Sequence, residues 1–216
     1  MAQLFPSSSN ALAKASVVVV AVLVAAVAYA VYAVDRSGYT TGEDVILTQP
    51  VPFSHDHHVG AIGIDCRYCH ASVESAGFAG MPPTATCMNC HTQIWSESPM
   101  LAPVRESYRT GKPIEWTRVH NLGDFVYFDH SIHVAKGMGC VTCHGRVDKM
   151  PLMWQDASLR MEWCLACHRN PEKHVRPRAE VFNLTWQPPA DADSLRRALI
   201  QEYKIKSLTH CSTCHR

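Results

Sequence analysis

The chain has 216 residues, with 20 Lys and Arg against 19 Asp and Glu, so its formal net charge is +1 at neutral pH. This balance provides no excess of positive charge for a phosphate backbone, and nucleic-acid binding is therefore not expected. Ten cysteines in so short a chain indicate a disulfide framework, metal sites or attached haem.

The first element is a long apolar segment near the N-terminus. Residues 15–34 (ASVVVVAVLVAAVAYAVYAV) carry no charge and would span about 30 Å as a helix, the thickness of a bilayer core. A cleavable signal peptide is the alternative, because Ala28-Tyr29-Ala30 resembles a cleavage site, but signal sequences have shorter apolar regions of about 7–15 residues. We predict a tail at 1–14, an uncleaved transmembrane anchor at 15–34 and a linker at 35–52.

All ten cysteines fall into five Cys-x-x-Cys-His motifs, called haem motifs one to five in chain order. In this pattern two thiols attach a c-type haem and the following His binds its iron. Disulfides do not require a His after every second Cys, and zinc ribbons do not repeat that feature five times. The sequence predicts five covalent haem c groups, attached through Cys66 and Cys69, Cys87 and Cys90, Cys140 and Cys143, Cys164 and Cys167, and Cys211 and Cys214.

The first four haem motifs belong to an internal repeat. Residues 53–91 and 128–168 each begin with Phe-x-His-x-x-His and then contain two haem motifs, spaced by 21 residues in the first repeat and 24 in the second. Met81-Pro82 and Met150-Pro151 occupy corresponding places between the paired motifs. The match indicates a duplication.

Residues 169–209 contain no haem motif. Within them, Asp193 is a candidate N-cap for a helix that places Leu195, Ala198 and Leu199 on one face. That face either packs on the haem-binding core or forms a docking surface for a partner.

The chain has thirteen histidines, more than the five haem motifs use. The motifs predict the proximal iron ligands His70, His91, His144, His168 and His215. In the Phe-x-His-x-x-His segments, a spacing of three residues places both rings on adjacent turns of a helix, so one segment can serve two neighbouring haems. With a fifth candidate from an aromatic-flanked segment, the predicted distal ligands are His55, His58, His120, His130 and His133.

Other side chains compete for the distal positions. The remaining histidines are His57, His174 and His210. Methionine is the chemical competitor, because a Met ligand raises the reduction potential above that of a haem with two His ligands. Methionine more often packs than binds metal, so one His–Met haem stays open as an alternative. The methionines near the haem motifs are Met81, Met150 and Met153.

The 181 residues after Asp35 leave about 36 for each of five haems, too few for an ordinary side-chain core. We therefore expect a mainly α fold with much irregular coil, in which a domain at 53–216 packs around stacked haems. Each haem adds two propionates, which arginines can bind. Candidates for this role, with plain solvated side chains as the alternative, are Arg67, Arg105, Arg109, Arg118, Arg146 and Arg169.

Iron with two axial ligands has no open position for a substrate. Because every haem motif ends in His and distal histidines are in surplus, the sequence favours electron transfer over catalysis at the haems. Haem c is attached outside the cytoplasm. This predicts a single-pass protein of the cell membrane, with its haem domain on the periplasmic side.

The repeated segments resemble those of class III multihaem cytochromes, in which FxHxxH precedes CxxCH and the two His serve different haems. A longer resemblance covers nearly the whole chain. The N-terminal anchor, FSHDHH…CRYCH, MPPTATCMNCH, PIEWTRVHNLGDFVYFDHSIH, GCVTCHGRVDKMP and MEWCLACHRNPE resemble the pentahaem membrane-anchored cytochrome subunit of bacterial alternative complex III.

That resemblance implies a quinol-oxidising assembly. Electrons would pass from an iron–sulfur subunit through five haems to a monohaem cytochrome or a periplasmic acceptor. The implied partners are the iron–sulfur subunit, polytopic quinol-binding membrane subunits and the monohaem cytochrome c.

Two other functions stay open. A stand-alone anchored quinol dehydrogenase of the tetrahaem family would feed a periplasmic reductase, but that family carries a Met just after its first motif (CxxCHxM), where this chain has Ala71-Ser72. A single uncharged helix is also a poor quinol site by itself. A catalytic multihaem reductase would need one open iron, which the surplus of distal histidines disfavours.

Overall fold

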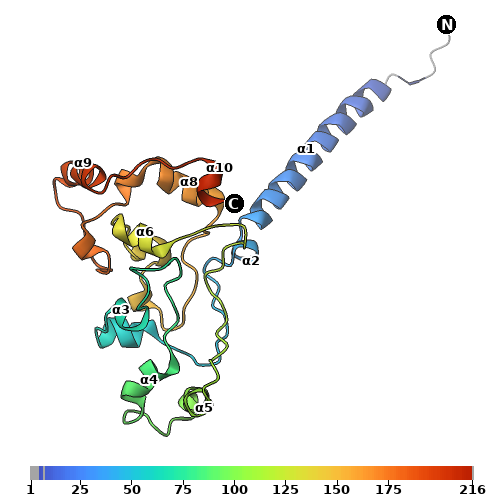
Figure 1. Ribbon diagram of the computed structural model, residues 1–216. Coiled ribbons are helices and arrows are strands. Elements are labelled where there is room, and N and C mark those ends of the chain that lie inside the picture. The colour runs from blue at the N-terminus through green and yellow to red at the C-terminus, as the bar shows by residue number, and fades with distance from the viewer. Residues whose placement is uncertain (1–4, 7, 216) are drawn as a thin grey trace. The chain divides into compact units, whose positions relative to one another are not determined.

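The computed structural model describes residues 5–6 and 8–215, and the chain forms two compact units, Met1–Gly42 and Glu43–Arg216 (Figure 1). The first unit contains helix α1 (Ser9–Asp35) and the short helix α2 (Gly38–Thr41). Helix α1 begins six residues before the predicted anchor, because Ala, Leu and Lys in that stretch are strong helix formers.

Helix α1 is apolar on all sides. Its 27 residues span about 40 Å, and none of its side chains is buried within the unit. It is long and apolar enough to cross a membrane, a property that membrane anchors share with signal sequences. At its C-terminal end the Arg36 guanidinium lies over the Tyr32 ring, 4.3 Å from the ring centroid.

The second unit is built from short helices joined by irregular coil. Pro and Gly residues, 13 and 11 in the chain, interrupt the helices before they become long. Its helices are a π-helix at Asp56–Ala61, α3 (Cys66–Cys69), α4 (Thr84–His91), α5 (Ala102–Thr110), α6 (His130–Ala135), α7 (Val141–His144), α8 (Met161–Arg169), α9 (Ala192–Glu202) and α10 (Cys211–Cys214), with single 3-10 turns at Pro99–Leu101, Val147–Lys149, Pro171–Lys173 and Arg178–Glu180.

Between residues 8 and 215 the β-structure consists of three isolated bridges, which pair Glu43 with Gln155, Val126 with His215, and Met138 with Val175. The prediction of a mainly α fold with much irregular coil is confirmed.

A small apolar cluster lies beneath helix α9. Leu199, Tyr203 and Val175 are its buried members, and Leu195 and Met138 pack against them. The predicted helix face therefore packs on protein side chains. Ala198, expected on the same face, is exposed instead, whereas Ile200 packs against the cluster.

The second unit has few buried apolar side chains. Among the described residues, nine hydrophobic residues are buried, and only Met150, Val175 and Val181 are almost completely so. Large apolar side chains beside the haem motifs are half or more exposed; they include Tyr68, Phe78, Trp95, Phe125 and Tyr127. Exposed aromatic surface of this extent is what porphyrin rings would cover, in keeping with a core made of haem.

Candidate haem-binding site

The five haem motifs all lie on short helices. Helices α3 and α4 carry the first and second motifs, α7 and α8 the third and fourth, and α10 the fifth. Two residues three positions apart on a helix project from one face, one turn apart, which suits the two attachment points of one haem. All ten cysteines are free of disulfide bonds.

The thiols of the third motif are held in their neutral form. Burial raises the pKa of Cys140 to about 11 and that of Cys143 to about 12. Within residues 5–6 and 8–215, moreover, no three His, Cys, Asp or Glu side chains gather as a metal site. The thiols therefore fit covalent haem better than zinc.

The helix of the first motif begins at an ionised cap. The Asp65 carboxylate accepts a hydrogen bond from the Arg67 backbone N–H at 2.8 Å and two from its guanidinium at 2.9 and 2.8 Å. The guanidinium bonds are the main reason that the pKa of Asp65 is lowered to about 2. The carboxylate fixes the first turn of α3, which carries Cys66 and Cys69.

Three proximal histidines each face one predicted distal histidine. An imidazole nitrogen bonds a metal ion at about 2 Å and lies about 1 Å from its ring centroid, so two rings that share one iron have centroids roughly 6 Å apart. The structure shows this separation in three pairs: His58 with His91 at 6.2 Å, His133 with His168 at 6.2 Å, and His130 with His144 at 6.3 Å.

Six of the ten predicted iron-binding imidazoles are oriented by backbone carbonyls. A carbonyl accepts only from an N–H group, so a ring whose Nδ1 lies next to a carbonyl carries its proton there and leaves Nε2 free to bind iron. Six rings have this contact, at 2.7 to 3.2 Å: His58 with Ser54, His70 with Gly80, His91 with Ile94, His130 with Gly77, His133 with Asp129, and His215 with Phe125.

The pairs follow the internal repeat. In the second repeat, His130 faces His144, the proximal ligand of the third motif, and His133 faces His168, the proximal ligand of the fourth. In the first repeat, His58 likewise faces His91, the proximal ligand of the second motif. The remaining equivalent pair is His55 with His70.

His55 is positioned near His70. Burial, followed by the nearby His70 and His58, lowers the pKa of His55 to about 4. Its Nδ1 atom is buried and has no hydrogen-bond partner among the described residues. His55 is therefore neutral at physiological pH, the form in which imidazole binds a metal ion.

His120 and His215 depart from this pattern. His120 Nε2 lies 3.2 Å from His144 Nδ1, on the side of the His144 ring where the proximal histidines of the first, second and fifth motifs contact a carbonyl. This contact supports a hydrogen-bonding role for His120, beside the role of fifth distal ligand predicted from the sequence. The His215 ring packs against Phe125, with centroids 5.8 Å apart.

The competing side chains are dispersed. Met150 is only 1% exposed and belongs to the packed interior, whereas Met81 is half exposed. His57 is exposed and stacks on Trp95, with ring centroids 6.2 Å apart. His210 is exposed at the N-cap of α10.

Most of the arginines proposed for propionates already have partners in the protein. Five of the six donate to protein acceptors: Arg67 to Asp65, Arg105 to the Ser96 and Ser98 carbonyls, Arg109 to Glu106, Arg118 to Asn121, and Arg146 to Asp148. The charges of Arg67, Arg109 and Arg146 are partly neutralised before a haem is bound, because their partners are carboxylates.

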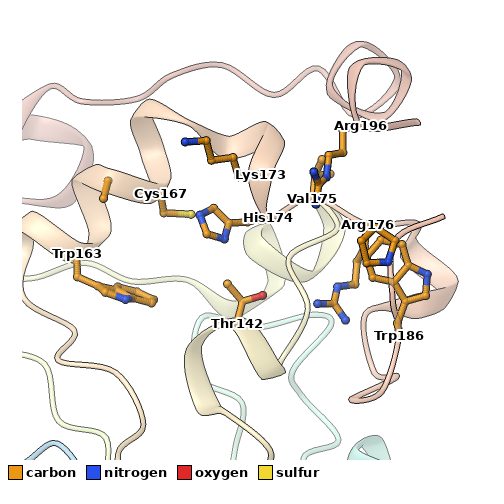
Figure 2. Close-up of a pocket in the computed structure, with 11 residues that line it drawn as sticks. Thr142, Trp163, Cys167, Lys173, His174, Val175, Arg176, Trp186 and Arg196 are labelled. Carbon is orange, nitrogen blue, oxygen red and sulfur yellow. The ribbon is translucent and has the colours of Figure 1, made fainter. Parts of the chain in front are cut away.

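A positively charged cavity of about 420 Å³ lies beside the fourth motif. Figure 2 shows the Cys167 side chain directed toward His174, with Arg176 next to Trp186. Arg176 is 7% exposed, lies 5.0 Å from the Trp186 ring centroid and has an Nε atom without a hydrogen-bond partner among the described residues. Sequence reasoning missed Arg176, because its burial depends on the distant Gly139, against which its guanidinium packs.

The residues present fit covalently bound haem. Paired cysteines on helical turns, thiols free of disulfide bonds and facing imidazoles at an iron-sized separation are what c-type haems require. Comparisons with known proteins agree. Residues 126–216 match the family model described as cytochrome c7 and related cytochrome c.

The chain is also 32% identical over 148 residues to a protein of Nitratidesulfovibrio vulgaris strain Hildenborough described as menaquinone reductase, multiheme cytochrome c subunit. The matched region covers 59% of this chain and 70% of that protein. The chain belongs to the multihaem cytochrome c family. As a multihaem cytochrome c, it carries covalently bound haem c and transfers electrons.

Proposed function

We propose that this multihaem cytochrome binds five haem c groups and is the electron-transfer subunit of a membrane quinol-oxidising complex of the alternative complex III type. The observation that supports it best is the pairing of proximal and distal imidazoles at 6.2 to 6.3 Å in both repeats. Haem supplies a centre that takes up and releases one electron, and two axial imidazoles leave no position at which a substrate would bind.

The haem motifs, the internal repeat and these ring separations support one set of iron ligands. The proximal set is His70, His91, His144, His168 and His215. The distal partners of the first four are His55, His58, His130 and His133, in the order His55 to His70, His58 to His91, His130 to His144, and His133 to His168. The fifth haem takes His120 or a methionine as its distal ligand.

In the proposed arrangement, α1 anchors the protein in the cell membrane and the second unit lies on the periplasmic side. The long apolar helix supports an anchor, and the extracytoplasmic assembly of haem c supports the side. Electrons would enter from an iron–sulfur subunit and leave to a monohaem cytochrome or a periplasmic acceptor. The motif string shared with the alternative complex III subunit supports these partners, together with polytopic quinol-binding subunits.

A second candidate reverses the direction of electron flow. The relative at 32% identity is described as a menaquinone reductase subunit, which favours a complex that reduces quinone. The haem sites serve either direction equally well, because a chain of one-electron carriers passes electrons along the gradient of potential between its partners. The partners therefore decide between the two candidates.

A pull-down from native membranes in mild detergent tests the proposal, using the full chain with a C-terminal tag. We expect five haems per chain, low-spin spectra, and co-purifying iron–sulfur, polytopic and monohaem subunits, with haem reduced on addition of quinol. The matched control carries Cys211→Ser and Cys214→Ser, and it should lose one haem of five.

Other outcomes separate the alternatives. A purified chain that oxidises quinol without partners would establish a stand-alone quinol dehydrogenase. An assembly that reduces quinone from a periplasmic donor would establish the second candidate. A high-spin haem that binds added ligands would favour a catalytic reductase.

A further inference from the structure

We propose that the five haem sites form a single row in the spatial order second, first, third, fourth, fifth, so that the second and fifth sites are its two ends. The inference rests on the proposed function in two respects, the presence of five haems and the proposed distal ligands. It assigns the neighbours of every site, which the order of the motifs along the chain does not.

The second and first sites are neighbours through residues inside their motifs. Asn89, between the two cysteines of the second motif, donates a hydrogen bond to the Tyr68 hydroxyl, which lies between the cysteines of the first, at 3.1 Å. Both motifs also draw their distal ligands from one segment, because His55 and His58 are only three residues apart. The first repeat therefore holds its two sites side by side.

The first and third sites adjoin where the two repeats meet. The segment after the first motif supplies two carbonyl groups. The Gly80 carbonyl accepts a hydrogen bond from His70, the proximal ligand of the first motif. The Gly77 carbonyl accepts one from His130, the proposed distal ligand of the third haem.

A second link runs through residues 181–182. The Arg67 guanidinium lies 4.6 Å from the Phe182 ring centroid, and the Val181 carbonyl accepts from the Cys140 N–H at 3.1 Å. Residues inside the first and third motifs thus contact the same two-residue segment from the C-terminal half of the chain.

The third and fourth sites share helix α6. His130 and His133 lie one turn apart on this helix and face His144 and His168, the proximal ligands of the third and fourth motifs. This is the same relation that joins the first and second sites in the other repeat.

The fifth site continues from the fourth. The Tyr127 N–H donates to the Cys214 carbonyl at 2.8 Å, and Val126 forms a β-bridge with His215. Phe128, which directly follows Tyr127, stacks on His133. His133 in turn faces His168 of the fourth motif. Figure 1 also shows α10 beside α8.

The arrangement of the short helices agrees with this order. In Figure 1, α4 with the second motif and α10 with the fifth lie at opposite ends of the second unit, with α3 and α6 between them.

The order has a simple basis in the repeat. The two repeats meet through their first sites, so each places its second site outward, and the fifth site then extends one side only. The two ends are consequently different, and each can serve a different partner.

Redox titration of the full chain in detergent tests the order with a matched pair of variants, His58→Met and His133→Met. These residues occupy equivalent positions in the two repeats, and a Met ligand raises the potential of the substituted haem. That haem is then reduced earlier, which removes one positive charge beside its neighbours and lowers their apparent potentials, an effect that declines with distance.

We expect His58→Met to lower the apparent potential of one other haem, and His133→Met to lower those of two. Two displaced neighbours for His58→Met, or only one for His133→Met, would overturn the order while leaving five electron-carrying haems in place. If a variant loses the substituted haem, the potentials of its neighbouring haems still change. One haem should then be affected in His58→Met and two in His133→Met. A wild-type protein with fewer than five haems would overturn both this order and the proposed function.

Discussion

Phe128 stacks face to face on His133, with ring centroids 4.5 Å apart and planes 27° apart. Phe53 lies on His58 in the same way, at 4.4 Å and 22°. Each phenyl ring also meets the first histidine of its segment edge-on, at 4.8 and 4.9 Å. The Phe of Phe-x-His-x-x-His therefore orients both imidazoles of the segment.

Replacing Phe128 by Leu removes this stacking while keeping an apolar side chain. We expect the variant to lose about 1 kcal/mol of stability, the usual contribution of an aromatic pair beyond its buried area. We also expect the electron paramagnetic resonance (EPR) signal of the fourth haem to broaden as the His133 ring gains freedom. Phe53→Leu is the matched control and should broaden the signal of the second haem instead; identical spectra for the two variants would contradict this assignment.

The angles between facing imidazoles predict two spectroscopic classes. The His130 and His144 planes are 10° apart, whereas the angles are 66° for His58 with His91 and 74° for His133 with His168. Parallel axial rings split the iron d orbitals more than crossed rings do. We expect an EPR signal of ordinary low-spin shape from the third haem and strongly anisotropic signals from the second and fourth. One uniform signal class would argue against these ring orientations.

The contact between His120 and His144 predicts the effect of removing an imidazole. A proximal histidine that donates to a strong acceptor binds iron more strongly and favours its oxidised form. Where a methionine serves the fifth haem, we therefore expect His120→Phe to raise the potential of the third haem, with every haem still low-spin by absorption and EPR spectroscopy. Conversion of one haem to high spin would instead establish His120 as an iron ligand. His120→Gln, which keeps an acceptor, should shift the potential less.

Acid sensitivity is expected from the ion pair of Asp148 with Arg146. Asp148 is 8% exposed and accepts two hydrogen bonds from the Arg146 guanidinium, at 2.7 and 2.6 Å. These bonds lower the pKa of Asp148 below its ordinary value of 3.8. A lowered pKa stabilises the folded state fully above the ordinary value, and this contribution is lost as the pH falls through the lowered one.

Asp148→Asn should therefore lower the Tm at neutral pH by a few degrees, and the difference from the wild type should shrink below pH 3.8. Thermal unfolding followed across pH measures this. Glu106→Gln is the control, because its partner Arg109 is exposed and solvent screens that pair. A difference for Asp148→Asn that persists unchanged in acid would show that the pair does not act through its charge.

Local patterns predicted the parts of the molecule that depend on local sequence. The haem motifs, the duplication and the sparse helices were accessible in this way, because each depends on spacing within one segment. The distal ligands stay proposals, although His58, His130 and His133 lie where the prediction requires them.

Relations between distant segments were not predictable from spacing. The contact of His120 with His144 crosses 24 residues, and the burial of Arg176 depends on Gly139. The order of the haem sites depends on which ends of the two repeats meet, and no motif encodes that choice. Helix α9 shows a smaller limit of the same kind, since periodicity alone did not distinguish the exposed Ala198 from its buried neighbours.

The small number of buried side chains has a consequence for biogenesis. A domain whose packed interior amounts to a few residues around Val175 and Met150 has little to hold it together before its cofactors arrive. The newly made polypeptide would stay open, with ten thiols available for wrong pairing or oxidation. Haem attachment then acts as the folding step itself, and a chain that misses one haem retains an open segment at which proteases can remove it.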